Sequence, residues 1–202
     1  AVEEALEHSE DEAPGCSWGN EFFTSRSALL LLLGGAAWLR LSSWRRVLIS
    51  GELMPQGGDS AYHLRRTMLT AETFPAVPAF DPWMNWPEGG LCHWAPGMDF
   101  LGGALVLGTG GEPGSLSAAV LVSLLPVLLG VVAVWMVVKI AQELLKPQTP
   151  GYVPLGCGAV MAMLPQAVAT SRFGRVDHHI FEVLCMGFLG LWVLRAVKGR
   201  PG

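Results

Sequence analysis

Residues 116–140 read LSAAVLVSLLPVLLGVVAVWMVVKI, and this stretch decides the class of the protein. Ser117 and Ser123 are its only hydroxyl side chains, and its single charged residue, Lys139, lies next to its end. An α-helix needs about 20 mostly apolar residues to cross a hydrocarbon core about 30 Å thick. The stretch therefore predicts a transmembrane helix.

Two segments farther along the chain are also expected to cross the membrane. Residues 153–170 hold Gln166 as their one strongly polar side chain, and residues 180–197 carry Glu182 and Arg195 near their ends. Both segments are close to the length that a spanning helix needs.

The first span is the least apolar of the four. Residues 28–38 alone cover about half of a membrane, and the helix reaches full length, at about 25–42, if Arg26 and Arg40 snorkel to opposite surfaces. The chain has 51% hydrophobic and 15% charged residues, so it is more apolar and less charged than an ordinary soluble domain. We therefore predict an all-α membrane protein with about four transmembrane helices.

Residues 1–24 are expected to form a solvated, disordered tail ahead of the membrane part, residues 25–198. Six acidic side chains fall within residues 3–12 of this tail, and the net charge of the chain is −4. Such a segment cannot bury enough apolar surface to fold by itself. No nucleic-acid partner is expected.

A loop of about 70 residues, 43–115, separates the first two predicted spans and is rich in proline and tryptophan. Loops of this length usually carry function, and tryptophan suits a membrane surface. Two short interfacial helices are expected within it. One follows the capping groups of Gly58-Asp59-Ser60 and ends near Phe74-Pro75, and the other covers about 97–108.

Four spans would place this long loop and the turn before residue 180 on the same side of the membrane. Asp59 follows the paired glycines Gly57 and Gly58, which let the backbone approach a ligand closely. Asp59 is thus a candidate site residue, and the alternative is that it only caps the helix that follows. His63 is close enough in sequence to assist Asp59, and its alternative is a surface imidazole.

The turn before the last span reads SRFGRVDHHIFE, residues 171–182. Asp177 and His179 offer one oxygen and one nitrogen donor to a cation such as Mg²⁺, Mn²⁺ or Zn²⁺. Arg172 and Arg175 add fixed positive charge that suits bidentate binding of a phosphate. The alternative is that these side chains only form a polar cap at the interface.

Three other ionisable residues are weaker candidates for the site. Glu182 lies three residues after His179, on the same helical face, and an ionisable group inside a span is a functional candidate by default. His93 is expected to belong to an aromatic belt, and His8 is expected to be solvated in the acidic tail.

Several motifs, taken together and in order, resemble one family. They are DSAYHLRR at 59–66, FDPWMNWPEG at 80–89, HWAPGMD at 93–99 and the SR and DHH of residues 171–179. This pattern resembles the catalytic subunits of oligosaccharyltransferases of the STT3/AglB/PglB type, over about residues 25–200.

The resemblance implies a GT-C-type multispanning helical bundle that binds Mn²⁺ or Mg²⁺ in its external loops. It implies transfer of a glycan from a polyprenyl or dolichyl phosphate or pyrophosphate to Asn in an Asn-X-Ser/Thr sequon, in a site facing the cell exterior or the ER lumen. Asp59, Asp177 and His179 match the catalytic, metal-binding positions.

Arg172, Arg175 and His63 are the candidate substrate-binding residues. The family also uses a later acidic residue and a Trp-Trp-Asp motif, and neither occurs here. The chain is therefore expected to be the amino-terminal part of such an enzyme and to be inactive alone.

Other functions stay open at this stage. A different GT-C transferase, moving a single sugar from a polyprenyl phosphate, would also carry an acidic first loop. A membrane scaffold or transporter fragment would use Asp59 and Asp177 only as helix caps. Soluble phosphoesterases with an Asp-His-His motif are a further class, but the apolar segments on both sides of the motif argue against this assignment.

Overall fold

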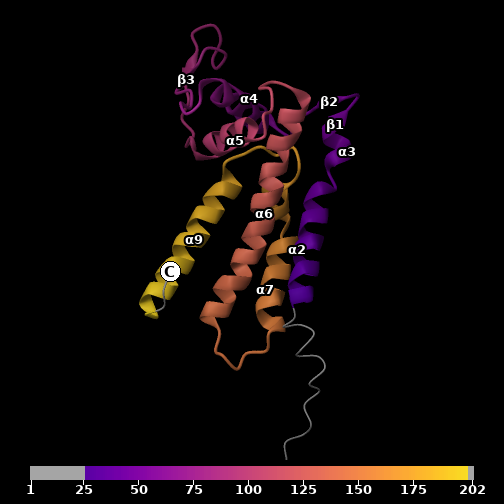
Figure 1. Cartoon of the computed structure of the whole chain (residues 1–202), viewed down its shortest axis with the longest axis vertical. Coiled ribbons are helices and arrows are strands. Elements are labelled where there is room, and N and C mark those ends of the chain that lie inside the picture. Colours follow the sequence, from indigo (N-terminus) through magenta and orange to yellow (C-terminus); the bar gives the residue numbers. More distant parts are fainter. Residues whose placement is uncertain (1–25, 200–202) are drawn as a thin grey trace, which may run out of the picture.

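The structure is a computed structural model that describes residues 26–199, so the predicted tail at 1–24 lies outside the described residues. Long helices run side by side along one axis, and a smaller layer of short helices and hairpins lies across one end of them (Figure 1). The long first loop therefore forms a layer of its own, separate from the bundle.

Helix α6 (Leu116–Leu144) is the central helix of the bundle. At 1.5 Å per residue it is roughly 43 Å long, more than a hydrocarbon core requires. It packs against α2 (Arg26–Leu41), α7 (Tyr152–Met163) and α9 (His179–Val197). Half of the residues in its most apolar 18-residue stretch are buried, whereas α2 and α9 leave most of their apolar residues uncovered. The prediction of a span at 116–140 is thus in agreement with a helix that continues to residue 144.

Within the described residues, three helices are long and apolar enough to cross a membrane: α2 together with the short α3 (Trp44–Val47), α6 and α9. The predicted continuous span at 153–170 is instead a bent pair, in which α7 and α8 (Pro165–Ser171) meet at 62°. The cause is Pro165, which has no N–H to donate to the preceding turn and disfavours helical geometry at Leu164. Counted as one span, this pair brings the number to four.

The sequence predicts that Arg40 snorkels to the surface, but in the structure Arg40 is fully buried. Its Nε donates to the Ser171 hydroxyl at 2.8 Å, and its Nη1 donates to the carbonyls of Ala36 and Ala162 at 3.1 and 3.3 Å. Ala162 lies in the last turn of α7, where the break in the helix leaves carbonyl groups without partners. Arg40 therefore joins the first span to the bent pair.

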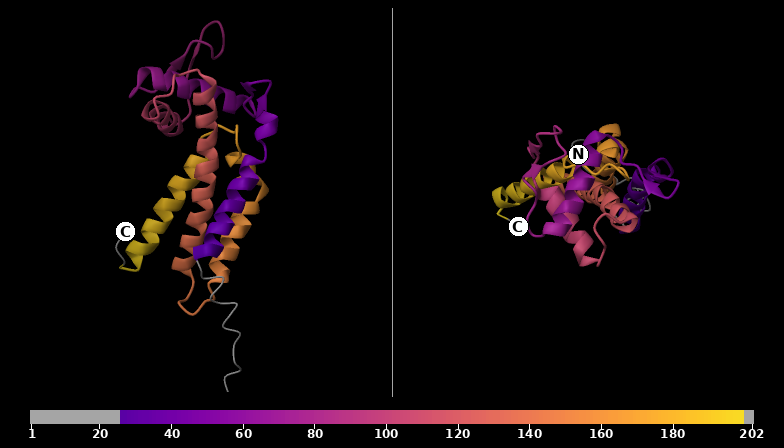
Figure 2. Two further views of the ribbon diagram at one scale, coloured as in Figure 1. Left: turned by 45° about the vertical axis from the view of Figure 1, so that its right-hand side comes forward. Right: turned by 90° about the horizontal axis from the view of Figure 1, so that it is seen from above.

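The two short helices predicted in the long loop are confirmed as α4 (Gly58–Thr73) and α5 (Gly97–Gly108). They pack on each other and lie across the end of the bundle (Figures 1 and 2). A Cβ at Gly102 or Gly103 of α5 would come within 2.6 Å of Thr67 or 2.9 Å of Thr70. This close approach buries a polar face of α4, which becomes important for the site.

Two hairpins in the loop were not predicted. β1 (Leu48–Ile49) pairs with β2 (Glu52–Leu53) through a turn in which Ser50 and Gly51 both have positive φ, and β3 (Phe80–Asp81) pairs with β4 (Gly90–Leu91). The segment between β3 and β4 carries the stacked, exposed Trp83 and Trp86. It projects beyond α4 and α5, away from the long helices (Figure 1).

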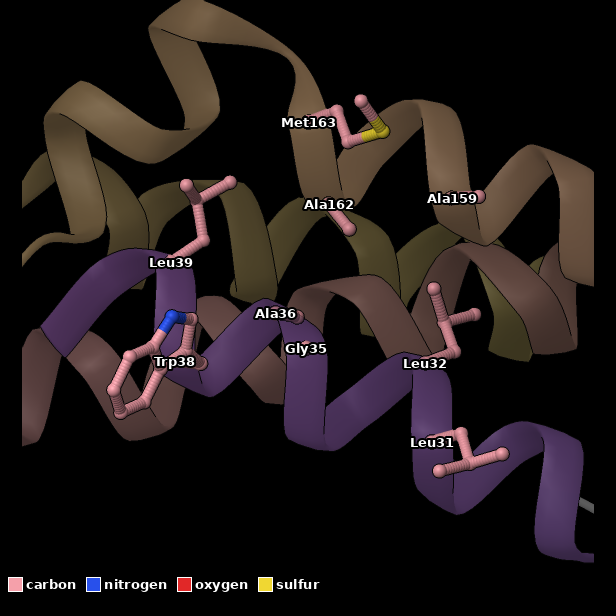
Figure 3. A pocket seen from close by; sticks show the side chains of 9 residues that line it. All are labelled: Leu31, Leu32, Gly35, Ala36, Trp38, Leu39, Ala159, Ala162 and Met163. Atoms are coloured by element: carbon pink, nitrogen blue, oxygen red, sulfur yellow. The ribbon is translucent and has the colours of Figure 1, made fainter. Parts of the chain in front are cut away.

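A groove of about 410 Å³ runs between α2 and α7 (Figure 3). Its lining is apolar and consists of side chains such as Leu31, Trp38 and Met163. None of the described side chains that line it is titratable, so it offers surface for lipid or another helix rather than a place for chemistry.

Gly130 of α6 provides a test of the contact around Arg40. A Cβ there would lie 2.5 Å from the Arg40 Nε and 2.6 Å from Ser171, whereas a Cβ at Gly190 of α9 would meet nothing within 4 Å. Overpacking costs about 1–3 kcal/mol, and alanine in an open helix position gains up to about 1 kcal/mol. Gly130→Ala is expected to lower the melting temperature in detergent and Gly190→Ala to leave it equal or higher. Equal melting temperatures for both variants would refute this packing.

Candidate functional site

The turn between α8 and α9 is fixed from outside by the end of the first span. The Phe173 N–H donates to the Arg40 carbonyl at 3.0 Å, and the Ser43 hydroxyl donates to the Phe173 carbonyl, also at 3.0 Å. Gly174 turns the chain at φ +80°, and a Cβ there would lie 2.6 Å from the Val47 side chain. The turn therefore follows one closely packed path.

Asp177 lies in this turn and is completely buried. Its Oδ2 is 3.2 Å from Nη2 of Arg175, and its Oδ1 is 3.1 Å from Nδ1 of His178. Neither oxygen receives a hydrogen bond of acceptable geometry from the part of the chain that the structure describes. A buried carboxylate in this condition is costly unless a cation or a donor satisfies it.

His63 of α4 is also fully buried, so the alternative of a surface imidazole is wrong. Its Nδ1 is 2.9 Å from Oδ1 of Asp99, and its Nε2 is 3.1 Å from Nδ1 of His178. Arg66 donates to the other oxygen of Asp99 at 3.0 Å, and the Thr67 hydroxyl lies 3.4 Å from the first. The polar face of α4 thus connects α5 to the start of α9.

Asp59 lies in the first turn of α4 and is exposed. The helix begins at Gly58, one residue before Asp59, so Asp59 is not its N-cap. Gly57, at φ +102°, holds the N-cap position, and no described side chain caps the helix. Arg175 donates to the Gln56 carbonyl at 2.8 Å and so ties the start of α4 to the turn of Asp177. Asp59 is in neither group of potential metal ligands that the described residues form.

His179 and Glu182 lie outside the buried part of the site. Their side chains are 52% and 53% exposed, and Nδ1 of His179 is 3.4 Å from Oε2 of Glu182. The sequence predicted Glu182 to lie deep in a span, but it lies on the exposed side of the first turn of α9. Nε2 of His179 is 4.0 Å from Oδ1 of Asp177.

The donors form two groups within which all ligand atoms lie within 4.8 Å of one another. The inner group is His63, Asp177 and His178, and the outer group is His178, His179 and Glu182. His178, the middle residue of the motif, belongs to both groups. The donor set of nitrogen and oxygen atoms suits a divalent cation.

The two arginines of the turn differ in what they contact. Arg175 is engaged by the Gln56 carbonyl and by Asp177. Arg172 is half-buried and lacks such an ion pair within the described residues, although the Nε atoms of both arginines are buried without a hydrogen-bond partner there. The predicted role of a phosphate-binding group is thus more readily available to Arg172 than to Arg175.

Sequence reasoning missed Asp99 and gave no role to His178. The available signal for Asp99 was its position as the single charged residue of an otherwise apolar helix. Burial raises the pKa of the Tyr62 hydroxyl, so this side chain stays neutral. Its ring lies against those of Trp94 and His63, at centroid distances of 4.8 and 5.3 Å, and helps to shield His63 from water.

Comparison with known proteins points to one group of relatives, although no protein-family model matches the chain. The dolichyl-monophosphooligosaccharide–protein glycotransferase AglB of Haloferax volcanii is 32% identical over 165 residues, which are 79% of this chain and 15% of the relative. A dolichyl-phosphooligosaccharide–protein glycotransferase of Archaeoglobus fulgidus is 28% identical over 166 residues, 78% of this chain and 26% of that one. The chain resembles the archaeal AglB oligosaccharyltransferases. This finding confirms the resemblance predicted from the motifs, and the named relatives are glycosyltransferases.

The fold agrees with the sequence match. The crystal structure of the Archaeoglobus fulgidus oligosaccharyltransferase in its apo form superposes with a TM-score of 0.70 at 25% identity, over 82% of this chain and 19% of that one. Matching oligosaccharyltransferase structures from Archaeoglobus fulgidus also include complexes with zinc and sulfate and with dolichol phosphate and an inhibitory peptide, and a form tethered to a peptide containing an NVT sequon. The chain spans less than a third of the length of its curated AglB relatives.

Substitutions at the adjacent Gly57 and Gly58 test whether Arg175 ties the start of α4, which carries Asp59, to the turn of Asp177. A Cβ at Gly57 would lie 2.7 Å from Nη1 of Arg175 in a backbone conformation that side chains disfavour, whereas a Cβ at Gly58 would meet nothing within 4 Å. Gly57→Ala is expected to cost about 1–2 kcal/mol of stability, because alanine disfavours the φ of +102° at this position, and to displace Arg175. Gly58→Ala is the matched control and should melt like the unmodified protein. A Gly57→Ala variant with unchanged melting temperature would contradict this description.

Proposed function

We propose that this chain is part of an oligosaccharyltransferase that moves a glycan from a polyprenyl or dolichyl phosphate or pyrophosphate to Asn in an Asn-X-Ser/Thr sequon. The observation that carries the proposal is Asp177, a buried carboxylate that receives no hydrogen bond from residues 26–199, placed where the long loop meets the last span. The named activity of the relatives supplies the reaction class.

The reaction sets clear chemical requirements. A bond forms between the amide nitrogen of the acceptor Asn and C1 of the sugar, and the bond between C1 and the phosphate oxygen breaks. The phosphate leaves with the electron pair, and the amide nitrogen loses a proton. An amide nitrogen is a weak nucleophile because its lone pair is delocalised, so the acceptor must be held by a carboxylate while negative charge on the phosphate is stabilised.

The exposed carboxylate of Asp59 suits the role of holding the acceptor amide, since it stands in the first turn of α4 with access to solvent. The resemblance implies that Asp59, Asp177 and His179 hold a divalent cation, with Mn²⁺ and Mg²⁺ as the expected ions. When bound, such an ion acts as a Lewis acid toward the leaving phosphate. The unsatisfied oxygens of Asp177 support a cation at this point.

The proposed substrate contacts follow from exposure. Arg172, unlike Arg175, is not held by an ion pair within the described residues, so we assign the phosphate to it, where its charge would stabilise the leaving group. Arg175 is better placed to position Asp177 and the start of α4 than to bind the donor. His63 is buried behind His178 and supports the site from within, so direct contact with substrate is not part of the proposal.

We also propose a multi-pass protein whose site faces the cell exterior or the ER lumen. The long loop and the turn of Asp177 lie at the same end of the bundle, as expected for a donor with a lipid tail among helices and a phosphate at the interface (Figure 1). Relatives solved with dolichol phosphate and with an NVT peptide support these two partners.

Glycosylation of a fluorescent Asn-X-Thr peptide by the full-length protein, with lipid-linked donor, tests the proposal. Asp59→Ala and Asp177→Ala are each expected to lower the rate on the order of a hundredfold or more, as removal of one electrostatic stabiliser does. Glu72→Ala removes an exposed carboxylate from the same helix as Asp59 and is the matched control. EDTA should abolish the activity and Mn²⁺ or Mg²⁺ should restore it. Full activity of both Asp variants, or in EDTA, would sink the proposal.

A further inference from the structure

We propose that His63, His178 and Asp177 form a second, inner cation site, which takes a borderline transition metal of the Zn²⁺ type. This site differs from the set that the resemblance implies, Asp59, Asp177 and His179, because it uses the middle histidine of the motif and a histidine of the long loop. It goes beyond the proposed glycosyl transfer and does not depend on it.

The spacing of the donor atoms is the first argument. Nε2 of His63 and Nδ1 of His178 are 3.1 Å apart, and Nδ1 of His178 and Oδ1 of Asp177 are also 3.1 Å apart. Tetrahedral zinc with bonds of about 2.0–2.1 Å holds its ligand atoms about 3.3 Å from one another. The donors are therefore already near the separation that coordination requires, and all three lie within 4.8 Å.

The second argument is the group behind each imidazole. Histidines that bind metals donate their other ring N–H to a carboxylate or a carbonyl, which fixes the tautomer and the ring orientation. Asp99 lies 2.9 Å from Nδ1 of His63, so the lone pair of Nε2 points toward His178. Oε1 of Glu182 is 3.8 Å from Nε2 of His178, which is beyond hydrogen-bond distance, so only His63 already has its orienting carboxylate in place.

The third argument is the condition of Asp177. It is fully buried, and neither of its oxygens has a hydrogen bond within the described residues. Arg175 approaches Oδ2 at 3.2 Å, which leaves Oδ1 facing His178. Without a cation, the N–H of His178 Nδ1 has two acceptors, His63 and Asp177, and satisfies only one of them well. A cation between the three groups would satisfy both.

The donor types indicate the class of ion. Two imidazole nitrogens and one carboxylate oxygen suit Zn²⁺ or Co²⁺ better than Mg²⁺, which prefers oxygen ligands and keeps several waters. Because the ligands come from α4 and from the turn before α9, an ion here would join the long loop to the last span. Its effect would be to hold Asp177 in place.

X-ray absorption of the full-length protein, stripped of metal and loaded with one equivalent of Zn²⁺, tests the site without any substitution. The inner site predicts two imidazole ligands, whereas Asp59, Asp177 and His179 would supply one. A spectrum with a single imidazole would overturn the inference. Neither donor nor peptide is present, so this result stands apart from the outcome of the glycosylation assay.

Cobalt titration of single-residue variants provides the second test. His63→Gln and His178→Gln are expected to weaken Co²⁺ binding at least tenfold and to remove the intense visible bands of low-coordinate Co²⁺, while Asp59→Asn and His179→Gln retain both. Asp99→Asn keeps all three ligands and should still weaken Co²⁺ 10–100-fold, as loss of an orienting carboxylate does. Loss of the bands in His179→Gln together with their retention in His178→Gln would overturn the proposal.

Discussion

A buried row of polar groups, running from Asp99 through His63 and His178 to Asp177, is the interaction on which the rest of the site depends. Arg66 closes one end of the row and Arg175 the other, so two carboxylates face two guanidinium groups. Charges that are removed from water must be compensated in this way, because an unpaired ion in the interior is strongly destabilising. The row therefore permits few arrangements of α4, α5 and the start of α9.

A second polar contact fixes the other side of the same turn. Arg40 donates from the first span to Ser171 and to the broken end of α7, while its carbonyl accepts the N–H of Phe173. Apolar side chains gain little by turning from lipid toward another helix, since lipid is as apolar as leucine, so buried polar contacts help to decide which faces of spanning helices meet. The buried Arg40 supplies such a contact. The bend at Pro165 and the turn of Asp177 are thus set by the first span, which is distant in sequence.

The apolar segments, the two loop helices and the candidate carboxylates were predictable, because each leaves a local signal. Residues 116–140 are apolar without interruption, and Asp177 stands beside histidines at the edge of another span. The burial of His63 and Arg40 was not predictable, since it depends on partners more than 30 residues away, such as Asp99 and Ser171. Hairpins with two-residue strands are too short for periodicity to reveal, although the Ser50-Gly51 turn between β1 and β2 was visible. Pro165 was also visible, and it should have marked the third span as broken.

The three residues of the Asp-His-His motif pass from the interior to the surface within a single turn of chain. The side chain of Asp177 is fully buried, that of His178 is 12% exposed and that of His179 is 52% exposed. The cause is the start of α9 at residue 179, where the chain leaves a packed turn and enters a helix that buries Ile180 and exposes His179 and Glu182 on its other side. A motif in this position can serve two purposes, because its first residues are held by the protein while its last remains available to a ligand. The middle histidine, which contacts both groups of donors, is then the residue through which the buried row is coupled to the exposed one.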